Sequence, residues 1–210
     1  MKKVSLILSA VVMSAMMLSS CGGGASKEVT IGKQVWMSEN LNVDKFRNGD
    51  PIPEAKTDEE WKKAGENGEP AWCYYDNDPA NGEKYGKLYN WFAVNDSRGL
   101  APVGYHIPSD AEWEKLEDFL GLDEGTKMKS TSGWAEIRNG TNESGFSGLP
   151  GGSRSPDGPF NYVGKYGYWW SSTANSTHFA EYRYLYYAKG KFYENWNVKR
   201  LGFSVRCLRD

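Results

Sequence analysis

The segment Ser109-Asp-Ala-Glu-Trp-Glu-Lys-Leu-Glu-Asp-Phe-Leu-Gly121 carries the clearest structural signal in the chain. Ser109 is followed three residues later by Glu112, the pattern of a capping box at the start of a helix. Four large apolar side chains then recur at helical spacing: Trp113, Leu116, Phe119 and Leu120. Because this spacing gathers them on one face, the segment predicts an amphipathic helix over residues 110–120 that ends at Gly121.

Two further elements are predicted on the N-terminal side of this helix. Thr57 and Glu60 form a second capping box, which predicts a short helix ending by Gly65. Further upstream, apolar residues alternate between Val29 and Met37 on both sides of a Gly-Lys turn at residues 32–33. Alternation around such a turn predicts an opening β-hairpin.

The second half of the chain has a different texture, rich in Gly, Ser, Asn and aromatic residues. Tyr and Trp alternate or cluster in short runs over residues 168–170 and 182–186, which predicts strands. A hairpin is expected to turn at Gly190, and alternating apolar residues predict a closing strand over 203–207. The order of a hairpin, two main helices and a strand-rich, loop-heavy second half indicates an α+β fold.

Composition limits the class of protein further. The chain has 9 Trp and 13 Tyr and few aliphatic residues, so we expect aromatic packing to hold the core. Five tryptophans in particular are expected to be buried: Trp36, Trp91, Trp113, Trp169 and Trp170. The formal net charge is −2 and the basic residues are scattered singly, which excludes nucleic acid as a partner.

The first residues of the chain indicate export. Lys2 and Lys3 precede an apolar stretch that runs to Leu18, and Leu18-Ser-Ser-Cys21 resembles a bacterial lipobox. We therefore predict a lipoprotein signal peptide over 1–20, a lipid anchor on Cys21 and a flexible tether over 21–28, followed by one domain over 29–210. The expected location is the outer membrane, on its periplasmic side or at the cell surface, with the membrane bound through the lipid.

Several blocks within residues 29–210 resemble the Fibrobacter succinogenes major paralogous domain. They include Ala71-Trp-Cys-Tyr-Tyr-Asp-Asn-Asp78, Gly104-Tyr-His-Ile-Pro-Ser-Asp-Ala-Glu-Trp113 and Gly202-Phe-Ser-Val-Arg-Cys-Leu-Arg209, in the family's order. More distantly, the segment Ile107–Trp113 and the closing block are similar to the formylglycine-generating enzymes. This second resemblance implies a C-type-lectin-like fold, and the first implies no established activity.

The two remaining cysteines, Cys73 and Cys207, allow two interpretations. They form a disulfide in the oxidising environment outside the cytoplasm, or they are separate buried thiols. Many relatives in the resembling family carry a cysteine at the position of Ala101, which implies a different usual partner for Cys207.

Catalytic and metal-binding patterns are sparse. The only histidines are His106, which is expected to be structural, and His178, which is expected in a surface loop. The copper-binding cysteine pair of formylglycine-generating enzymes lies close together in sequence, unlike the two cysteines here. Asp76, Asp78 and Asn81 form a weak calcium candidate that does not match the EF-hand pattern, and an Asn/Asp-rich turn is favoured. We therefore expect no enzyme and no cofactor, with calcium the one open alternative.

Exposed aromatic residues in the second half are the remaining candidates for binding. By analogy with the C-type-lectin-like fold we expect a ligand to meet its loops, which contain Asn161, Tyr162, Tyr166, Tyr193, Asn195 and Trp196. The favoured hypothesis is a tethered module that binds a glycan or a surface protein. The alternatives are an enzyme related to the formylglycine-generating type and a structural component of an envelope assembly.

Overall fold

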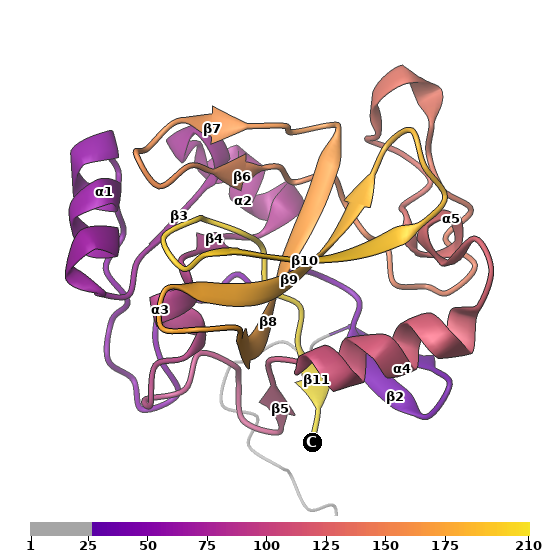
Figure 1. The fold of residues 1–210 in the computed structure, drawn as a ribbon, viewed down its shortest axis with the longest axis horizontal. Coiled ribbons are helices and arrows are strands. Elements are labelled where there is room, and N and C mark those ends of the chain that lie inside the picture. The colour runs from indigo at the N-terminus through magenta and orange to yellow at the C-terminus, as the bar shows by residue number, and fades with distance from the viewer. Residues whose placement is uncertain (1–26) are drawn as a thin grey trace, which may run out of the picture.

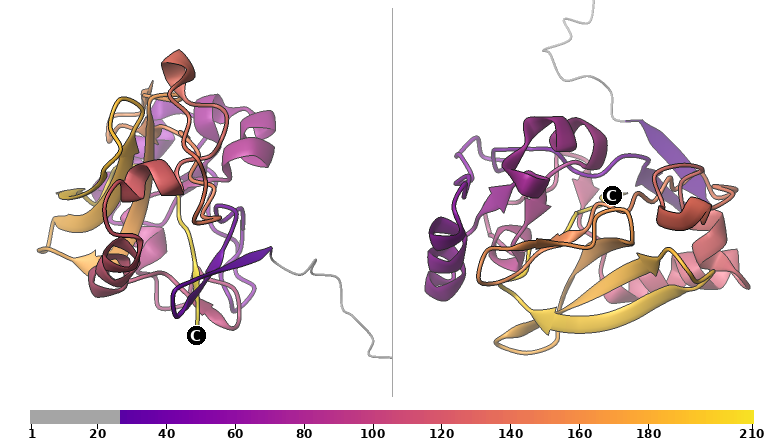
Figure 2. Two further views of the ribbon diagram at one scale, coloured as in Figure 1. Left: turned by 90° about the vertical axis from the view of Figure 1, so that its right-hand side faces the viewer. Right: turned by 90° about the horizontal axis from the view of Figure 1, so that it is seen from above.

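The computed structural model describes residues 27–210 (Figures 1 and 2). The predicted signal peptide, the lipid anchor Cys21 and residues 22–26 of the predicted tether lie outside the described residues. Two sheets contain most of the strands. One has the order β1-β2-β11-β5, with β1 (Glu28–Ile31), β2 (Gln34–Met37), β11 (Leu208–Arg209) and β5 (Tyr105–His106); the other has the order β10-β9-β8, with β10 (Phe192–Val198), β9 (Phe179–Tyr186) and β8 (Tyr166–Ala174).

The remaining elements are short. Two pairs of strands stand apart: β3 (Trp72–Cys73) with β4 (Leu88–Tyr89), and β6 (Ser153–Arg154) with β7 (Phe160–Asn161). The helices of the described chain are α1 (Asp58–Asn67), α2 (Pro79–Tyr85), α3 (Trp91–Val94), α4 (Asp110–Leu120) and α5 (Glu124–Met128), with 3-10 turns at Tyr75–Asn77 and Ala135–Ile137. All pairings between the named strands are antiparallel, which confirms the α+β class.

The opening hairpin is confirmed, and it joins the two ends of the domain. Val29 pairs with Trp36, and the turn between the strands uses Gly32 at φ 62°, a conformation that favours glycine. On its other edge β2 pairs with β11 through Trp36 and Leu208. The first and last strands of the domain therefore share one sheet, beside α4 in Figure 1.

Both predicted helices form, with two corrections. The capping boxes of α1 and α4 are present as expected, but α1 continues to Asn67 and ends at Gly68, not at Gly65. Gly68 takes a left-handed conformation at φ 70° and its N–H binds the carbonyls of the last turn, which Gly65 does not do. In α4, Trp113, Leu116 and Leu120 are buried, whereas Phe119 is 63% exposed at the edge of the apolar stripe.

The closing strand differs from the prediction. Regular pairing is limited to β11, while residues 202–207 are all buried. Residues 202–204 make isolated bridges, and the carbonyls of Val205 and Cys207 accept from the N–H groups of Leu41 and Met37. The hairpin that turns at Gly190 is confirmed, since Leu185 of β9 pairs with Phe192 of β10. The chain end thus passes through the core between the sheets, and for this reason the alternation of residues 203–207 does not mark a surface strand.

Aromatic side chains fill the core, as expected. The five tryptophans predicted to be buried are each less than 5% exposed. The cluster behind α4 contains Trp36, Trp113 and Phe146 in mutual ring contact at 4.6–6.0 Å, with Trp169 5.5 Å from Phe146. None of the helices in the described part of the chain is both long and apolar enough to span a bilayer.

Candidate functional site

One face of the β8–β9–β10 sheet is lined with tyrosines. Side chains alternate along a strand, and Tyr166 and Tyr168 of β8 pair with Tyr186 and Tyr184 of β9, while Tyr193 of β10 pairs with Tyr184. These five residues therefore point to the same side, and Tyr162 precedes them at the edge of the sheet. We call the set Tyr162, Tyr166, Tyr168, Tyr184, Tyr186 and Tyr193 the tyrosine face.

The rings of the tyrosine face stack on one another. Tyr166 stacks on Tyr168 at 5.4 Å and on Tyr186 at 4.6 Å, and Tyr184 stacks on Tyr193 at 4.9 Å between ring centroids. Tyr162 meets the edge of Tyr166 at 5.3 Å. Such cross-strand aromatic pairs hold each side chain in place, so the surface is rigid before any ligand arrives.

The hydroxyl groups of this surface are available to a ligand. Among residues 27–210, no hydrogen bond is made by the hydroxyls of Tyr166, Tyr168 or Tyr184, and none of the three oxygens is buried. Burial of the rings raises the pKa of all three above the usual value near 10, with a smaller contribution from neighbouring tyrosines. At neutral pH each group is therefore a neutral phenol that can both donate and accept.

The tyrosine face is also uncharged. Between Tyr166 and Asn197 the positions that share its side of the sheet are Tyr, Trp, Ala and Asn, apart from the turn residue Lys191, whose ammonium lies 6.0 Å from the Tyr193 ring. Part of this side is core: Trp170, Ala180 and Tyr182 are buried beside Phe203, on which Tyr168 also stacks at 4.8 Å. The charged residues of these strands, Glu181, Arg183 and Glu194, alternate to the opposite side, toward α4. Trp169, Leu185 and Phe192 are on that opposite side too and pack into the core.

The residues predicted to bind are only partly brought together. Tyr162, Tyr166 and Tyr193 belong to the tyrosine face, and Asn195 shares its side of the sheet because it pairs with Tyr182. Trp196 points to the opposite side, where it is 51% exposed and meets Phe179 at 5.0 Å. On β7, Asn161 uses its amide to donate to Ser155 Oγ and Pro159 O.

The side chains of the weak calcium candidate Asp78 and Asn81 make local hydrogen bonds to the backbone. Asp78 Oδ1 caps α2 by accepting from the Ala80 N–H at 2.9 Å, and Asn81 Nδ2 donates to the Tyr75 carbonyl at 2.9 Å. Asp76 takes a left-handed conformation at φ 54°, which Asp tolerates in turns.

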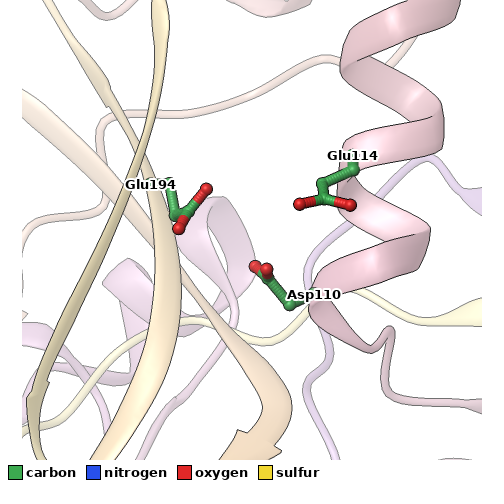
Figure 3. A group of neighbouring side chains, drawn as sticks. All are labelled: Asp110, Glu114 and Glu194. Carbon is green, nitrogen blue, oxygen red and sulfur yellow. The ribbon is translucent and has the colours of Figure 1, made fainter. Parts of the chain in front are cut away.

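A group of carboxylates gathers elsewhere, between α4 and β10 (Figure 3). Ligand atoms of Asp110, Glu114 and Glu194 lie within 4.8 Å of one another. The buried guanidinium of Arg183 already pairs with Asp110 at 2.7 Å and with Glu194 at 3.4 Å, and it also reaches Glu117 at 3.1 Å. Arg183 thus joins two carboxylates of α4 to one of β10 and fastens the helix to the sheet, while its single positive charge offsets only part of the negative charge of the group.

Cys73 and Cys207 are free thiols, which corrects the disulfide alternative. Cys73 lies in the cluster around α1 and Cys207 in the cluster around β4, and neither is exposed to solvent. Burial raises the pKa of each thiol to about 12. Buried protonated thiols are poor nucleophiles and poor metal ligands.

His106 is held between two carboxylates. Its Nδ1 lies 2.8 Å from Asp210 Oδ1 and its Nε2 lies 3.0 Å from Glu112 Oε1. Burial alone lowers the pKa of His106, but the hydrogen bonds to Asp210 and Glu112 outweigh it and the net shift is upward. Glu112 is the residue that closes the capping box of α4, so His106 ties the chain end to the start of that helix.

The family model of the Fibrobacter succinogenes major domain matches residues 29–209. The chain belongs to this family. No curated protein and no solved structure matches it.

Two buried arginines help to build the scaffold. Arg154 is fully buried and donates to the carbonyls of Ala55, Thr57 and Gly158 at 2.7–2.9 Å. In the closing block Arg206 is buried too and donates to Asn40 Oδ1 and to the Met37 and Phe146 carbonyls. These two side chains join segments that are far apart in the sequence and so help to fix the fold.

The tyrosine face was only half visible in the sequence. The alternation of Tyr182, Tyr184 and Tyr186 predicts a strand, but only the register with β8 and β10 shows that Tyr168, Tyr184 and Tyr186 join the predicted Tyr166 and Tyr193. The sequence did contain one usable signal: Tyr166 and Tyr168 are spaced two residues apart, like Tyr182, Tyr184 and Tyr186, so two neighbouring strands could have been expected to place their tyrosines on the same side of a sheet.

Proposed function

We propose that this protein is a non-enzymatic binding module that a lipid on Cys21 holds at the outer membrane, and that its tyrosine face binds a glycan or a surface protein. The observation that carries the proposal is a rigid, uncharged sheet surface with phenolic hydroxyls free to bind a ligand. Tyrosine gives a large amphipathic contact area at low conformational cost, and for this reason binding surfaces are rich in it.

The lack of charge on the tyrosine face favours a neutral glycan over a charged protein. A neutral glycan offers hydroxyls that pair with phenols and apolar C–H patches that pack against rings. A charged protein surface would instead be steered by complementary charge, and the charged side chains of these strands point to the opposite side.

An enzymatic role related to the formylglycine-generating type receives no support from the cysteines. That chemistry needs two thiols that hold copper together, whereas Cys73 and Cys207 occupy different core clusters with their pKa raised to about 12. Copper analysis of the purified protein tests this part of the proposal, since a bound equivalent of copper would contradict it.

We further propose the C-type-lectin-like fold that the sequence resemblance implies. Its support is the pairing of both chain ends in one sheet, and the position of α4 against a second sheet formed by the later strands. Superposition of an experimental structure on domains of that fold tests it, and a different order of strands would reject it.

Binding is tested with the mature lipidated protein on an array of neutral and acidic oligosaccharides. The variant Tyr166→Phe/Tyr184→Phe keeps both rings and removes two free hydroxyls. At about 1 kcal/mol for each hydrogen bond, its affinity for a ligand found on the array should fall roughly 30-fold.

The matched control is Tyr105→Phe, because the Tyr105 hydroxyl already donates to Glu28 Oε1 in the other sheet and Tyr105 is not part of the tyrosine face. It should leave binding unchanged. The proposal fails if no glycan binds and pull-downs recover no protein partner, or if the control variant loses as much affinity as the double variant.

The location is tested by protease treatment of intact cells. Loss of the domain from treated cells would place it at the surface, and protection would place it on the periplasmic side. Recovery of the protein in the soluble fraction would contradict the lipid anchor.

A further inference from the structure

Two exposed apolar side chains stand at the C-terminal end of α4, and we call them together the apolar patch. Phe119 is 63% exposed beside the hairpin turn, and Leu122, just beyond the end of the helix, is 89% exposed in the neighbouring hollow. The turn of the opening hairpin packs against Phe119 so closely that a Cβ on Gly32 would stand 2.9 Å from the ring. A groove of about 490 Å³ runs between the turn and the helix, lined mainly by Ile31, Phe119 and the side-chain stems of Lys33 and Lys115.

Charges of both signs surround this patch. Lys33 and Lys115 border it on the hairpin side, and Asp118 and Asp123 border it near Leu122. Within residues 27–210 neither lysine is paired with a carboxylate. Long lysine stems can lie on an apolar surface while their charged ends stay in water, which is the arrangement found where a protein meets a bilayer.

The chain that precedes the domain places this patch near a membrane. Cys21 lies six positions before Lys27, and six extended residues span at most about 20 Å. From Glu28 the strand β1 leads directly to Gly32, about 13 Å further on. An anchor on Cys21 therefore keeps Phe119 and Leu122 within reach of the lipid that holds the anchor.

We propose that Phe119 and Leu122 dock on the phospholipid surface to which Cys21 is anchored. This inference rests on the proposed lipid anchor and goes beyond the proposed ligand binding. Two apolar side chains hold a free domain on a bilayer only weakly, but the tether makes the contact intramolecular and so raises its occupancy. Paired positive and negative groups at the rim suit zwitterionic headgroups.

Docking in this orientation brings the bilayer beside one edge of the tyrosine face. Leu122 and Tyr193 line the same hollow, which is formed by the end of α4 and the start of β10. Tyr166 and Tyr168 belong to β8, on the far edge of the sheet order β10-β9-β8. A membrane at Leu122 therefore lies next to Tyr193 and away from the β8 tyrosines.

The test uses full mature lipidated protein in phosphatidylethanolamine and phosphatidylglycerol vesicles that carry brominated acyl chains. A fluorophore is attached at L122C, and the buried Cys73 and Cys207 do not react in the folded protein. The control position is D157C, in the exposed β6–β7 loop at the end of the molecule away from α4 in Figure 1. The expected result is several-fold stronger quenching at position 122 than at position 157, reduced when F119S is added.

Three results would overturn the inference, and they are distinguishable. Equal weak quenching at both positions, in protein that floats with the vesicles, removes the docking and leaves the anchor intact. Failure to float shows that the lipid anchor itself is absent. Shielding of position 122 in vesicles without bromine, together with a dimer in sedimentation, shows that a second copy covers the patch.

Discussion

Replacement of Asn40 by Ala should destabilise the domain strongly, although Asn40 is a single polar residue. Its Oδ1 accepts from Trp169 Nε1 and Arg206 Nη2, each at 2.8 Å, and from Arg206 Nε at 3.1 Å. Its Nδ2 donates to the Tyr85 carbonyl at 2.8 Å. Trp169 and Arg206 are both 0% exposed, so water does not replace the lost acceptor.

The size of the effect follows from what remains unpaired. The Trp169 N–H loses its acceptor and the Tyr85 carbonyl loses the Asn40 donor, at about 1–3 kcal/mol for each buried group. Arg206 keeps its bonds to Met37 and Phe146 but loses two to Asn40, in a site where burial already lowers its pKa to about 9. We expect a loss of about 4 kcal/mol in the free energy of unfolding, a large share of the roughly 5–15 kcal/mol of a typical domain.

Urea unfolding followed by tryptophan fluorescence measures this loss. With a slope near 2 kcal/mol/M, the midpoint should fall by about 2 M. Asn40→Asp should lose less, because a carboxylate still accepts these bonds and adds a negative charge beside Arg206. The exposed Asn175→Ala is the matched control and should change the stability by less than about 0.5 kcal/mol. A loss below about 1 kcal/mol for Asn40→Ala would refute the reasoning.

Three further changes test the scaffold. The pKa of His106 is raised in the folded state. The stability that protonated His106 contributes is therefore complete below the ordinary pKa of 6.5 and is lost as the pH rises through the raised pKa. His106→Gln should remove this pH dependence from urea midpoints measured between about pH 5 and 9. Ala101→Cys should form a disulfide with Cys207, because the two positions belong to the same core cluster. Mass spectrometry should show a loss of about 2 Da, and the free energy of unfolding should rise by about 2–4 kcal/mol. The control Ala101→Ser should show neither change. Leu116→Ala should cost about 2–5 kcal/mol in thermal or urea unfolding, whereas Phe119→Ala should cost far less, and equal losses would contradict the exposure of Phe119.

The parts of the fold that follow from local chemistry were predictable. The capping boxes at Thr57 and Ser109 and the hairpin turn at Gly32 act over a few neighbouring residues, and all three are present. The short helices α2 and α3 were missed because helices of 7 and 4 residues leave little periodicity to detect. Asp78 caps α2 and Asn90 caps α3. In the sequence, however, Asp and Asn are equally typical of ordinary turns, so neither residue indicated a helix.

The exposure of Phe119 shows where helical spacing stops being informative. A periodic pattern locates the centre of an apolar stripe, but the neighbours decide how wide the buried part is. Here Leu116 and Leu120 belong to the core cluster that includes Leu185 and Phe192 of the sheet and Met128 of α5, whereas Phe119 lies outside this cluster, against Gly32 of the hairpin turn. A residue at the edge of the stripe is then free to meet another surface.

Only one part of the candidate site could be predicted from the sequence, namely which residues of one strand share a side of the sheet. Asn195 and Trp196 are adjacent in β10 and therefore cannot point to the same side, so one of the two was excluded from any common surface by the alternation alone. Which of them joins Tyr166 depends on the register of three strands. That register is set by long-range packing, which the sequence does not display.

The contrast between the two sides of the β8–β9–β10 sheet supports the proposed role of the tyrosine face. The side toward α4 packs with Trp169, Leu185 and Phe192, which carry little or no polar surface. The other side packs its rings just as closely yet carries hydroxyls that reach solvent, and packing alone does not need them. Tyrosine also has a high strand propensity, so these hydroxyls have two explanations. Tyr166→Phe/Tyr184→Phe separates them: unchanged stability with weakened ligand binding assigns the hydroxyls to recognition, and loss of stability assigns them to the fold.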